Sequence, residues 1–322
     1  MSETTLSDPF VYAIPMPLRF RGIQQRQGLL FRGEAGWAEW SPFLDYDPPE
    51  AARWLQAARE AADHGFPPPL RQSIPVNSTI PATDPATAHR LAREAGCTTA
   101  KVKVAEVGQT LADDLARVEA VRDALGPQGR VRIDANGAWT LDQATQALRQ
   151  LSRFDLEYAE QPCRDVTDLA RLRKLSSVRI AADESIRRVE DPYLVKRLEA
   201  ADIAVLKVQP LGGVLSCLRL AESLGLEVVV SSALETSIGL QAGIALAAAL
   251  PELPYACGLN TASLLAMDVT ADPLVAVNGE IAVRTIQVDP CRMMALRADQ
   301  ASAEAWQARL AQCEQVLGGL DG

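Results

Sequence analysis

Apolar and polar residues follow two alternating patterns along this chain, and their succession predicts a parallel α/β fold. Short runs rich in Val, Ile and Ala have the character of buried strands, and segments with helical spacing of apolar residues separate them. One such segment carries a stripe made of Leu111, Leu115, Val118, Val121 and Leu125. The eight strand candidates are residues 76–82, 99–104, 130–136, 158–163, 179–185, 204–210, 227–235 and 255–260.

Eight strands that alternate with helices predict a (β/α)₈ barrel of the TIM type. Thr140 and Gln143 have the spacing of a helix capping box and mark the start of one intervening helix. The chain has 322 residues, which exceeds a barrel of about 250 residues by enough for one small additional domain.

The first part of the chain follows a different pattern. Residues 8–47 alternate hydrophobic positions with glycine turns, which is typical of a small antiparallel sheet. Pro48 then opens a helical segment that ends at Gly65, and three prolines at 67–69 form a linker. These features predict a small domain that caps the barrel.

We therefore assign residues 1–75 to an N-terminal α+β capping domain and residues 76–285 to the barrel catalytic domain. The tail, residues 286–322, contains no ninth strand and helix unit. We expect this tail to pack back on the N-terminal sheet and to complete the capping domain.

Composition and charge argue against several classes of protein. The chain has 32 basic and 41 acidic residues, a net charge of -9, and no long basic run, so we expect no nucleic-acid partner. Residues 238–250 are apolar but shorter than the roughly 18 residues of a bilayer span, so we expect no membrane partner. The six cysteines form no C-x-x-C pair and no secretory signal precedes Asp8, which predicts reduced thiols and a cytoplasmic location.

Acidic residues recur at near-constant intervals, each at the end of a predicted strand. Asp134 lies in VRIDANGAW, Glu160 in EYAEQPC and Asp183 in IAADESI. Intervals of 26 and 23 residues separate these acids, and Lys207 follows 24 residues later. A helix, its loops and the next strand fill such an interval, and a barrel brings the ends of its strands to one rim. The sequence therefore predicts that three carboxylates converge.

Three carboxylates on successive strands suit a divalent cation that prefers hard oxygen ligands, with Mg²⁺ as the expected ion and Mn²⁺ as the alternative. Zinc is disfavoured because His64 and His89 fall in predicted helices and no cysteine pair has ligand spacing. Asn136 and Glu184 lie close in sequence to two of the acids and are expected to orient them. Any single acid could instead cap a helix or pair with an arginine.

Lysines flank the acidic series in the sequence. Lys101 and Lys103 are two positions apart on one predicted strand, so both side chains point to the same side, into the barrel mouth. Burial and a like-charged neighbour lower the pKa of a lysine and make its neutral amine available as a base. The alternative interpretation is an exposed edge strand that carries ordinary solvated lysines.

A cation between two groups of lysines is the arrangement that abstraction of a proton α to a carboxylate requires. The cation takes up the charge of the enediolate while a strand lysine removes the proton. We therefore expect a small-molecule carboxylate as the substrate, and nothing in the pattern fixes an oligomeric state.

Five further residues are candidates for support or substrate contact. Arg132 precedes the first acid by two positions and shares its inward face, where it orients a carboxylate or a lysine, or forms a structural ion pair. Ser231, Ser232 and Gly258 lie on the last two predicted strands, where they receive a substrate carboxylate or serve only in turns. Glu235 is either a site carboxylate or a helix N-terminal residue.

Six motifs together resemble those of the muconate-lactonising subgroup of the enolase superfamily, over nearly the whole chain. The motifs are KVKV, RIDANGAW, YAEQP, AADES, VLKVQPLGG and SSALETSIG. The resemblance implies an enolase-type barrel in which the three carboxylates hold Mg²⁺ and Lys103 is the acid and base. Lys207 would then face it from the opposite side, and Lys101 would chiefly tune Lys103.

Within the subgroup, the N-terminal sheet, residues 36–43 (GWAEWSPF) and residues 267–274 (MDVTADPL) resemble dehydratases of menaquinone synthesis. The resemblance implies a lyase that removes water in syn fashion from 2-succinyl-6-hydroxy-2,4-cyclohexadiene-1-carboxylate, through an enediolate. Lys103 would take the α-proton and return a proton to the departing hydroxyl, and the Lys207 ammonium would favour the electron-rich ring.

Two alternatives stay open on the sequence alone. An N-acylamino acid racemase of the same superfamily, such as an N-succinylamino acid racemase, uses lysines on both faces as paired bases, and the residues of this chain permit that chemistry. A non-catalytic carboxylate-binding barrel would keep the metal site without turnover.

Overall fold

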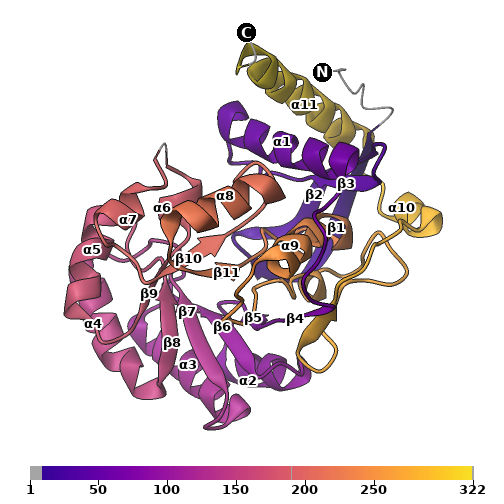
Figure 1. Cartoon of the computed structure of the whole chain (residues 1–322). Helices are drawn as coiled ribbons and strands as arrows, with labels where there is room; N and C mark the ends of the chain where they lie inside the picture. Colours follow the sequence, from indigo (N-terminus) through magenta and orange to yellow (C-terminus); the bar gives the residue numbers. More distant parts are fainter. Residues whose placement is uncertain (1–8, 190, 321–322) are drawn as a thin grey trace.

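The computed structural model describes residues 9–189 and 191–320, which form a small N-terminal sheet with its helices and a larger barrel (Figure 1). The N-terminal sheet is antiparallel, as its alternating pattern predicts. Its strands, in spatial order, are β1 (Phe10–Phe20), β2 (Ile23–Arg32) and β3 (Trp37–Trp40).

Helix α1 (Pro48–His64) packs against β3, and both of its ends are capped as the sequence predicts. The carboxylate of Asp47 accepts a hydrogen bond from Glu50 N at 2.9 Å, and prolines occupy the first turn, where a missing N–H group costs nothing. The helix ends at Gly65, whose φ of 70° suits glycine. Trp54, on the inner face of the helix, is fully buried.

The C-terminal tail returns to the outer edge of the N-terminal sheet. Ala13 N donates a hydrogen bond to Leu296 O at 2.9 Å, and Ala298 N donates one to Val11 O at 3.1 Å. These main-chain bonds extend β1 by one more segment of chain. The tail is thus joined to the edge strand of the N-terminal sheet by main-chain hydrogen bonds.

Helix α11 (Gln300–Leu320) completes this packing, because it lies beside α1 (Figure 1). Trp306 of α11 meets Trp40 of β3 edge to face, with ring centroids 5.4 Å apart. A large aromatic contact therefore joins the last helix of the chain to the first sheet.

The barrel is built on a seven-stranded parallel sheet whose strands lie in sequence order, which confirms the predicted α/β architecture. The strands are β5 (Ser78–Ile80), β6 (Thr99–Lys103), β7 (Arg130–Asp134), β8 (Leu156–Glu160), β9 (Ile180–Ala182), β10 (Ile203–Leu206) and β11 (Glu227–Val230). The helices that follow them are α2 (Pro85–Glu94), α3 (Leu111–Leu125), α4 (Leu141–Leu151), α5 (Val166–Leu175), α6 (Glu184–Arg187) with α7 (Leu194–Arg197), α8 (Val214–Leu224) and α9 (Ser237–Ala249).

The helices begin and pack where the sequence predicts. The capping box of α4 is present, because Gln143 N donates to Thr140 Oγ1 at 3.3 Å and Thr140 N donates to Gln143 Oε1 at 2.9 Å. Within the apolar stripe of α3, Val118 and Val121 are fully buried. Figure 1 shows the helices on the outside of the curled sheet.

Residues 257 and 258 close the ring between β11 and β5, in place of the regular eighth strand predicted over 255–260. Cys257 N donates to Pro75 O at 2.7 Å, and Gly258 N donates to Val230 O at 2.8 Å. Glycine is required at 258 because a Cβ there would lie 2.5 Å from the hydroxyl oxygen of Ser231. The close approach of two backbones shortens this strand to a pair of bridges.

The remaining elements are short. They are β4 (Ser73–Pro75) paired with β12 (Glu280–Ala282), the 3₁₀ turns at Ser152–Phe154 and Ala262–Leu264, and α10 (Pro290–Ala295). All six cysteines are unpaired thiols. Among the residues that the structure describes, no helix has both the length and the apolar character needed to span a membrane.

Candidate active site

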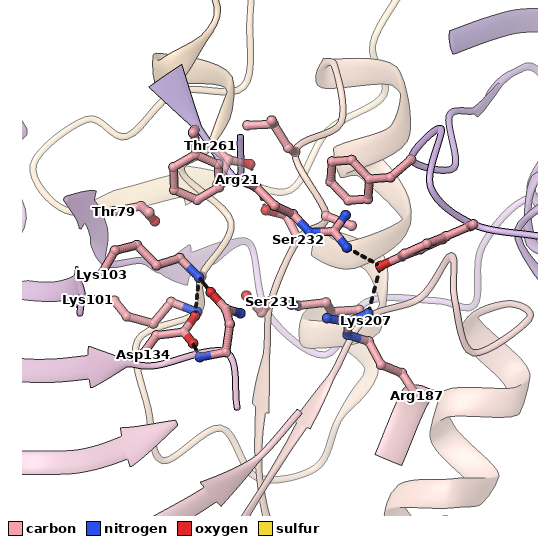
Figure 2. A pocket seen from close by; sticks show the side chains of 17 residues that line it. Arg21, Thr79, Lys101, Lys103, Asp134, Arg187, Lys207, Ser231, Ser232 and Thr261 are labelled. Carbon is pink, nitrogen blue, oxygen red and sulfur yellow. Dashed lines mark hydrogen bonds and ion pairs between the residues drawn. The ribbon is translucent and has the colours of Figure 1, made fainter. Parts of the chain in front are cut away.

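A cavity that opens to solvent lies at the rim where the barrel strands end, beneath the capping domain (Figure 2). Residues from both domains line it. From the capping domain come Phe20, Arg21, Phe43 and Tyr46. From the barrel come Thr79, Lys101, Lys103, Asp134, Asn136, Arg187, Lys207, Ser231, Ser232, Ala233, Leu234, Gly258 and Thr261.

The three acids predicted to converge end three neighbouring strands. Asp134 is the last residue of β7 and stands in register with Glu160, the last residue of β8. Asp183 directly follows β9, and all three residues are at most 1% exposed. Asp134 lines the cavity, and the other two carboxylates end the neighbouring strands, in surroundings that water hardly reaches.

Ammonium groups hold the oxygens of these carboxylates. Lys101 Nζ lies 2.8 Å from Glu160 Oε2, and Lys103 Nζ lies 2.5 Å from Asp134 Oδ2. Lys207 makes the corresponding contact with Asp183. Figure 2 shows Lys101 and Lys103 on one side of the site and Lys207 on the other.

Asp183 is held from two sides. Lys207 Nζ lies 2.6 Å from Asp183 Oδ2, and Arg187 Nε lies 2.7 Å from Asp183 Oδ1. Burial acts to raise the pKa of Asp183, but the charges of Arg187 and Lys207 outweigh it and hold the pKa well below its usual range. Arg187 lies outside the sequence motifs. Its position four residues after Asp183 is nevertheless the spacing at which two side chains of a helix can form an ion pair.

The pKa values of the other site groups diverge for physical reasons. Burial, together with the neighbouring charges of Asp134 and Asp183, raises the pKa of Glu160 to about 7. Burial acts to lower the pKa of Lys101, yet Glu160 and Asp134 outweigh it and raise the pKa above its ordinary value. This corrects the expectation of a depressed lysine pKa for Lys101, which keeps its proton because two carboxylates face it.

The donor set fits a hard divalent cation, although it is not arranged as a finished cage. Within residues 9–189 and 191–320, no group of three or more His, Cys, Asp or Glu side chains is placed to hold a metal ion as it stands. The carboxylate oxygens face ammonium and guanidinium groups instead. Burial and the repulsion from Asp134 and Asp183 together raise the pKa of Glu160, and a bound cation would relieve this repulsion.

Asn136 and Glu184 lie within hydrogen-bonding reach of one another, and Asn136 contacts two of the predicted site residues. Asn136 N donates to Asp134 Oδ1 at 3.0 Å, and Asn136 Oδ1 accepts from Lys103 Nζ at 2.5 Å. The Asn136 amide also donates to Glu184 Oε1 at 3.1 Å. Asn136 has a φ of 46°, a left-handed conformation that asparagine tolerates better than most residues.

Two of the four cap residues that line the cavity, Phe20 and Arg21, occupy the tip of the β1–β2 hairpin, outside the sequence motifs. Arg21 lies 3.8 Å above the Phe43 ring and donates to the Tyr46 hydroxyl at 3.0 Å (Figure 2). No local motif marks these positions, because their role arises only when the capping domain docks on the barrel.

Of the weaker candidates, Ser231, Ser232 and Gly258 line the cavity. Arg132 and Glu235 lie elsewhere. Arg132 is buried deeper in the barrel. Its partners there are Glu157 Oε2, Asn77 Oδ1 and Ala256 O, and its guanidinium stands over the Tyr158 and Tyr255 rings.

Glu235 lies behind the cavity wall, where its carboxylate accepts from Ala233 N at 2.9 Å. It is 1% exposed, and burial together with the charge of Glu39 raises its pKa to about 7. The side chain therefore belongs to the buried contact between cap and barrel, away from the lysines.

The fold and the site together define a class of protein. Residues 84–287 match a family model described as enolase C-terminal domain-like, and residues 11–62 match one described as enolase N-terminal domain-like. A muconate lactonizing enzyme from Pseudomonas fluorescens superimposes with a TM-score of 0.79 at 23% identity, covering 90% of this chain and 98% of that chain. An L-Ala-D/L-Glu epimerase from Bacillus subtilis does so with a TM-score of 0.75 at 21% identity, covering 87% and 96%. The chain is a member of the enolase superfamily, which confirms the resemblance seen in its motifs.

Curated relatives narrow the assignment. An o-succinylbenzoate synthase from Thermobifida fusca is 61% identical over 93% of this chain and 94% of its own length. Those from Mycolicibacterium smegmatis and Mycobacterium tuberculosis are 50% and 48% identical over 95% and 98% of this chain, and over 95% and 96% of their own lengths. The chain belongs to the o-succinylbenzoate synthase family.

Proposed function

We propose that this protein is a Mg²⁺-dependent lyase that dehydrates 2-succinyl-6-hydroxy-2,4-cyclohexadiene-1-carboxylate to 2-succinylbenzoate, as a step in menaquinone synthesis. The observation that carries the proposal is the placement of Lys103 and Lys207, which line one cavity from different strands above three strand-end carboxylates. The identity of 61% to an o-succinylbenzoate synthase supports the choice of substrate.

Lys103 is the proposed acid and base. Its side chain is 16% exposed against 6% for Lys101, so its Nζ reaches the cavity more freely. In the neutral form, Lys103 Nζ takes the proton from the ring carbon that bears the carboxylate. The resulting ammonium gives this proton to the hydroxyl oxygen as the C–O bond breaks, and water leaves from the same face.

Lys207 remains an ammonium on the other side of the ring, where Asp183 holds it at 2.6 Å. Its positive charge stabilises the electron-rich intermediate by electrostatic and cation–π attraction. Lys101 keeps its proton against Glu160 and adds a fixed positive charge beside Lys103. When bound to the three carboxylates, Mg²⁺, or Mn²⁺ with the same ligand preference, supplies positive charge for the substrate carboxylate.

The cavity also suits the second carboxylate of the proposed substrate. Arg21 stands at the cap side of the cavity, and Ser231 and Ser232 line the wall formed by the end of β11. A guanidinium binds a carboxylate through two parallel hydrogen bonds, which fixes the orientation of the succinyl chain. A chain with a net charge of -9 thus presents a cluster of cations where a dianion must bind.

A direct comparison of rates tests the proposal. Purified protein with Mg²⁺ is given the cyclohexadiene substrate, whose loss is followed by absorbance, and N-succinylamino acids, whose racemisation is followed by polarimetry. We expect the dehydration to have the higher kcat/KM. Faster racemisation would favour the second candidate, a two-base racemase, which the placement of lysines on both sides of the cavity permits.

A separate measurement addresses a binding-only protein. Incubation in D₂O with Mg²⁺ and either class of substrate reports proton exchange at the α-carbon. The absence of turnover with the diene, and of exchange with every carboxylate tried, would overturn the proposed function.

A further inference from the structure

We propose that Arg26 and Glu39, two buried residues of the capping domain, are positioning residues that fix the β11–α9 loop (residues 231–236), whose residues 231–234 line the cavity. Neither residue lines the cavity, and both act through the main chain of this β11–α9 loop. The kinetic part of the inference rests on the proposed function.

Arg26 donates hydrogen bonds to two main-chain carbonyl groups of the β11–α9 loop. Arg26 Nε donates to Leu234 O at 2.7 Å, and Arg26 Nη2 lies 3.4 Å from Ala233 O. Both loop residues also line the cavity. Arg26 is 2% exposed and also stands 4.7 Å from the ring of Phe43, a second cavity residue.

The conformation of Leu234 shows why the loop needs this anchor. Leu234 has a φ of 69°, in the left-handed region that a branched aliphatic residue rarely adopts. Such a conformation is energetically unfavourable and persists only where the surroundings impose it. The bond from Arg26 to the carbonyl of the same residue supplies that constraint from across the domain boundary.

Glu39 holds the far end of the loop, where α9 begins. Its Oε2 accepts from Thr236 N at 3.0 Å and from Gly239 N at 3.1 Å, so a side chain of the cap binds the free N–H groups of a barrel helix. A Cβ at Gly239 would lie 2.9 Å from Glu39 Oε2, so the approach leaves no room for a side chain.

Ser41 joins the two anchors into one unit. Its hydroxyl lies 2.9 Å from Arg26 Nη2 and donates to Glu39 Oε1 at 2.7 Å. Tyr12 donates to the same oxygen at 2.6 Å. Each hydrogen-bond partner of Glu39 donates to its carboxylate. All of these bonds can form together only when the cap and the β11–α9 loop keep their relative positions.

The position of the wall has a definite kinetic consequence. Lys103, the proposed acid and base, ends β6, and Lys207, the proposed fixed ammonium, directly follows β10. A shift of the β11–α9 loop therefore weakens substrate binding and leaves the chemistry in place. Displacements of about 1 Å cost up to about 100-fold in such sites. We expect loss of the anchors to raise KM about tenfold or more, with kcat changed by less than about threefold.

The test uses Arg26→Met, Arg26→Lys and Glu39→Gln, with Arg59→Met as the matched control. Arg59 pairs with Glu314 at 2.7 Å and joins α1 to α11, away from the cavity. Steady-state kinetics give kcat and KM, and hydrogen–deuterium exchange reports protection of the loop. We expect the anchor variants to raise KM and loop exchange, with Arg26→Lys intermediate, whereas Arg59→Met changes neither.

The KM and kcat split separates positioning from simple stability. A merely structural role would reduce the fraction of active protein and lower the apparent kcat at unchanged KM. A folded Arg26→Met protein with wild-type KM and wild-type loop exchange would overturn the inference; if this variant does not fold, Arg26→Lys is judged by the same criterion. If the wild-type protein fails to turn over the diene, the proposed function fails, and loop exchange still decides the role of Arg26.

Discussion

Lys101 and Glu160 form a buried ion pair, with Nζ and Oε2 2.8 Å apart, although they belong to strands separated by β7. The pair joins a residue of the KVKV motif to the middle member of the acidic series. The pair keeps Lys101 protonated. In the proposed mechanism, Lys101 therefore provides a fixed charge, and its neighbour on the same strand, Lys103, exchanges the protons.

Replacement of Lys103, the proposed acid and base, should abolish the reaction. Lys103→Ala should lower kcat by about 1,000-fold or more, because no other amine of β6 can reach the α-proton while Lys101 stays paired. Circular dichroism should show an unchanged fold. Lys174→Ala, at an exposed position of α5, is the control and should keep full activity. A Lys103→Ala protein with near-normal kcat would rule out the assignment.

Replacement of the opposite lysine should also abolish dehydration. Lys207→Ala removes the ammonium that stabilises the electron-rich ring and leaves Asp183 with Arg187 as its remaining cationic partner. We expect a loss in kcat of about 100-fold or more at nearly unchanged fold. Activity within about threefold of wild type would show that the charge of Lys207 is not used.

Removal of divalent metal should stop turnover reversibly. Exhaustive treatment with EDTA is expected to abolish activity, and Mg²⁺ is expected to restore it, because the proposed reaction needs the positive charge of the cation for the substrate carboxylate. Isothermal titration of Mg²⁺ into the chelated protein gives an independent readout of binding. Full activity after chelation would remove the metal from the mechanism.

The ion pair of Lys101 should contribute to stability when metal is absent. Lys101→Met leaves Glu160 and Asp134 without one buried cation, and loss of one partner of a buried pair costs about 3 kcal/mol or more. Urea unfolding of the chelated protein measures this cost, and added Mg²⁺ should recover part of it. Equal stability of variant and wild type without metal would contradict the role assigned to the pair.

Glu235 should make stability depend on pH near neutrality. Its pKa is raised from 4.5 to about 7, so the folded protein binds its proton more tightly than the unfolded chain. The associated stability is present below about pH 4.5 and is lost as pH rises through about 7, which amounts to about 3 kcal/mol at most. Glu235→Gln should flatten this part of the pH profile of the unfolding free energy, and the contribution of Glu160, which has the same sign, should remain. An unchanged profile would contradict the raised pKa.

The closure of the barrel predicts one further stability effect. Gly258→Ala places a Cβ 2.5 Å from Ser231 Oγ and should lower the free energy of unfolding by about 1–3 kcal/mol. Gly318→Ala, where no atom lies within 4 Å of the new Cβ, is the control and should be neutral or slightly stabilising. A melting temperature of Gly258→Ala equal to that of wild type would show that Ser231 moves aside freely.

The sequence predicts most of the barrel because a lysine or an acidic residue recurs at the ends of successive strands. The sequence does not show how far below the rim of the barrel an inward-facing residue lies. Arg132 shares an inward face with Asp134, but two residues of strand correspond to about 6.6 Å, so Arg132 lies a layer below the rim among Tyr158 and Tyr255. The inward-facing pattern alone is the same for both positions.

Contacts between domains are likewise invisible in the motifs. Arg21 and Arg26 lie in a strand pattern that predicts only a sheet, and their roles depend on which barrel loop the cap docks against. The predicted eighth strand over 255–260 fails for a related reason. Its pairing is decided by the gap left between β11 and β5, which local propensity does not determine.

The hydrogen bonds between Ala13 and Leu296 and between Ala298 and Val11 bear on how the protein is made. A ribosome delivers the first strand long before its partner near the end of the chain, so this sheet edge stays unmatched throughout translation. The barrel can begin to assemble during synthesis, whereas the domain encoded first is finished last, after the whole polypeptide has emerged.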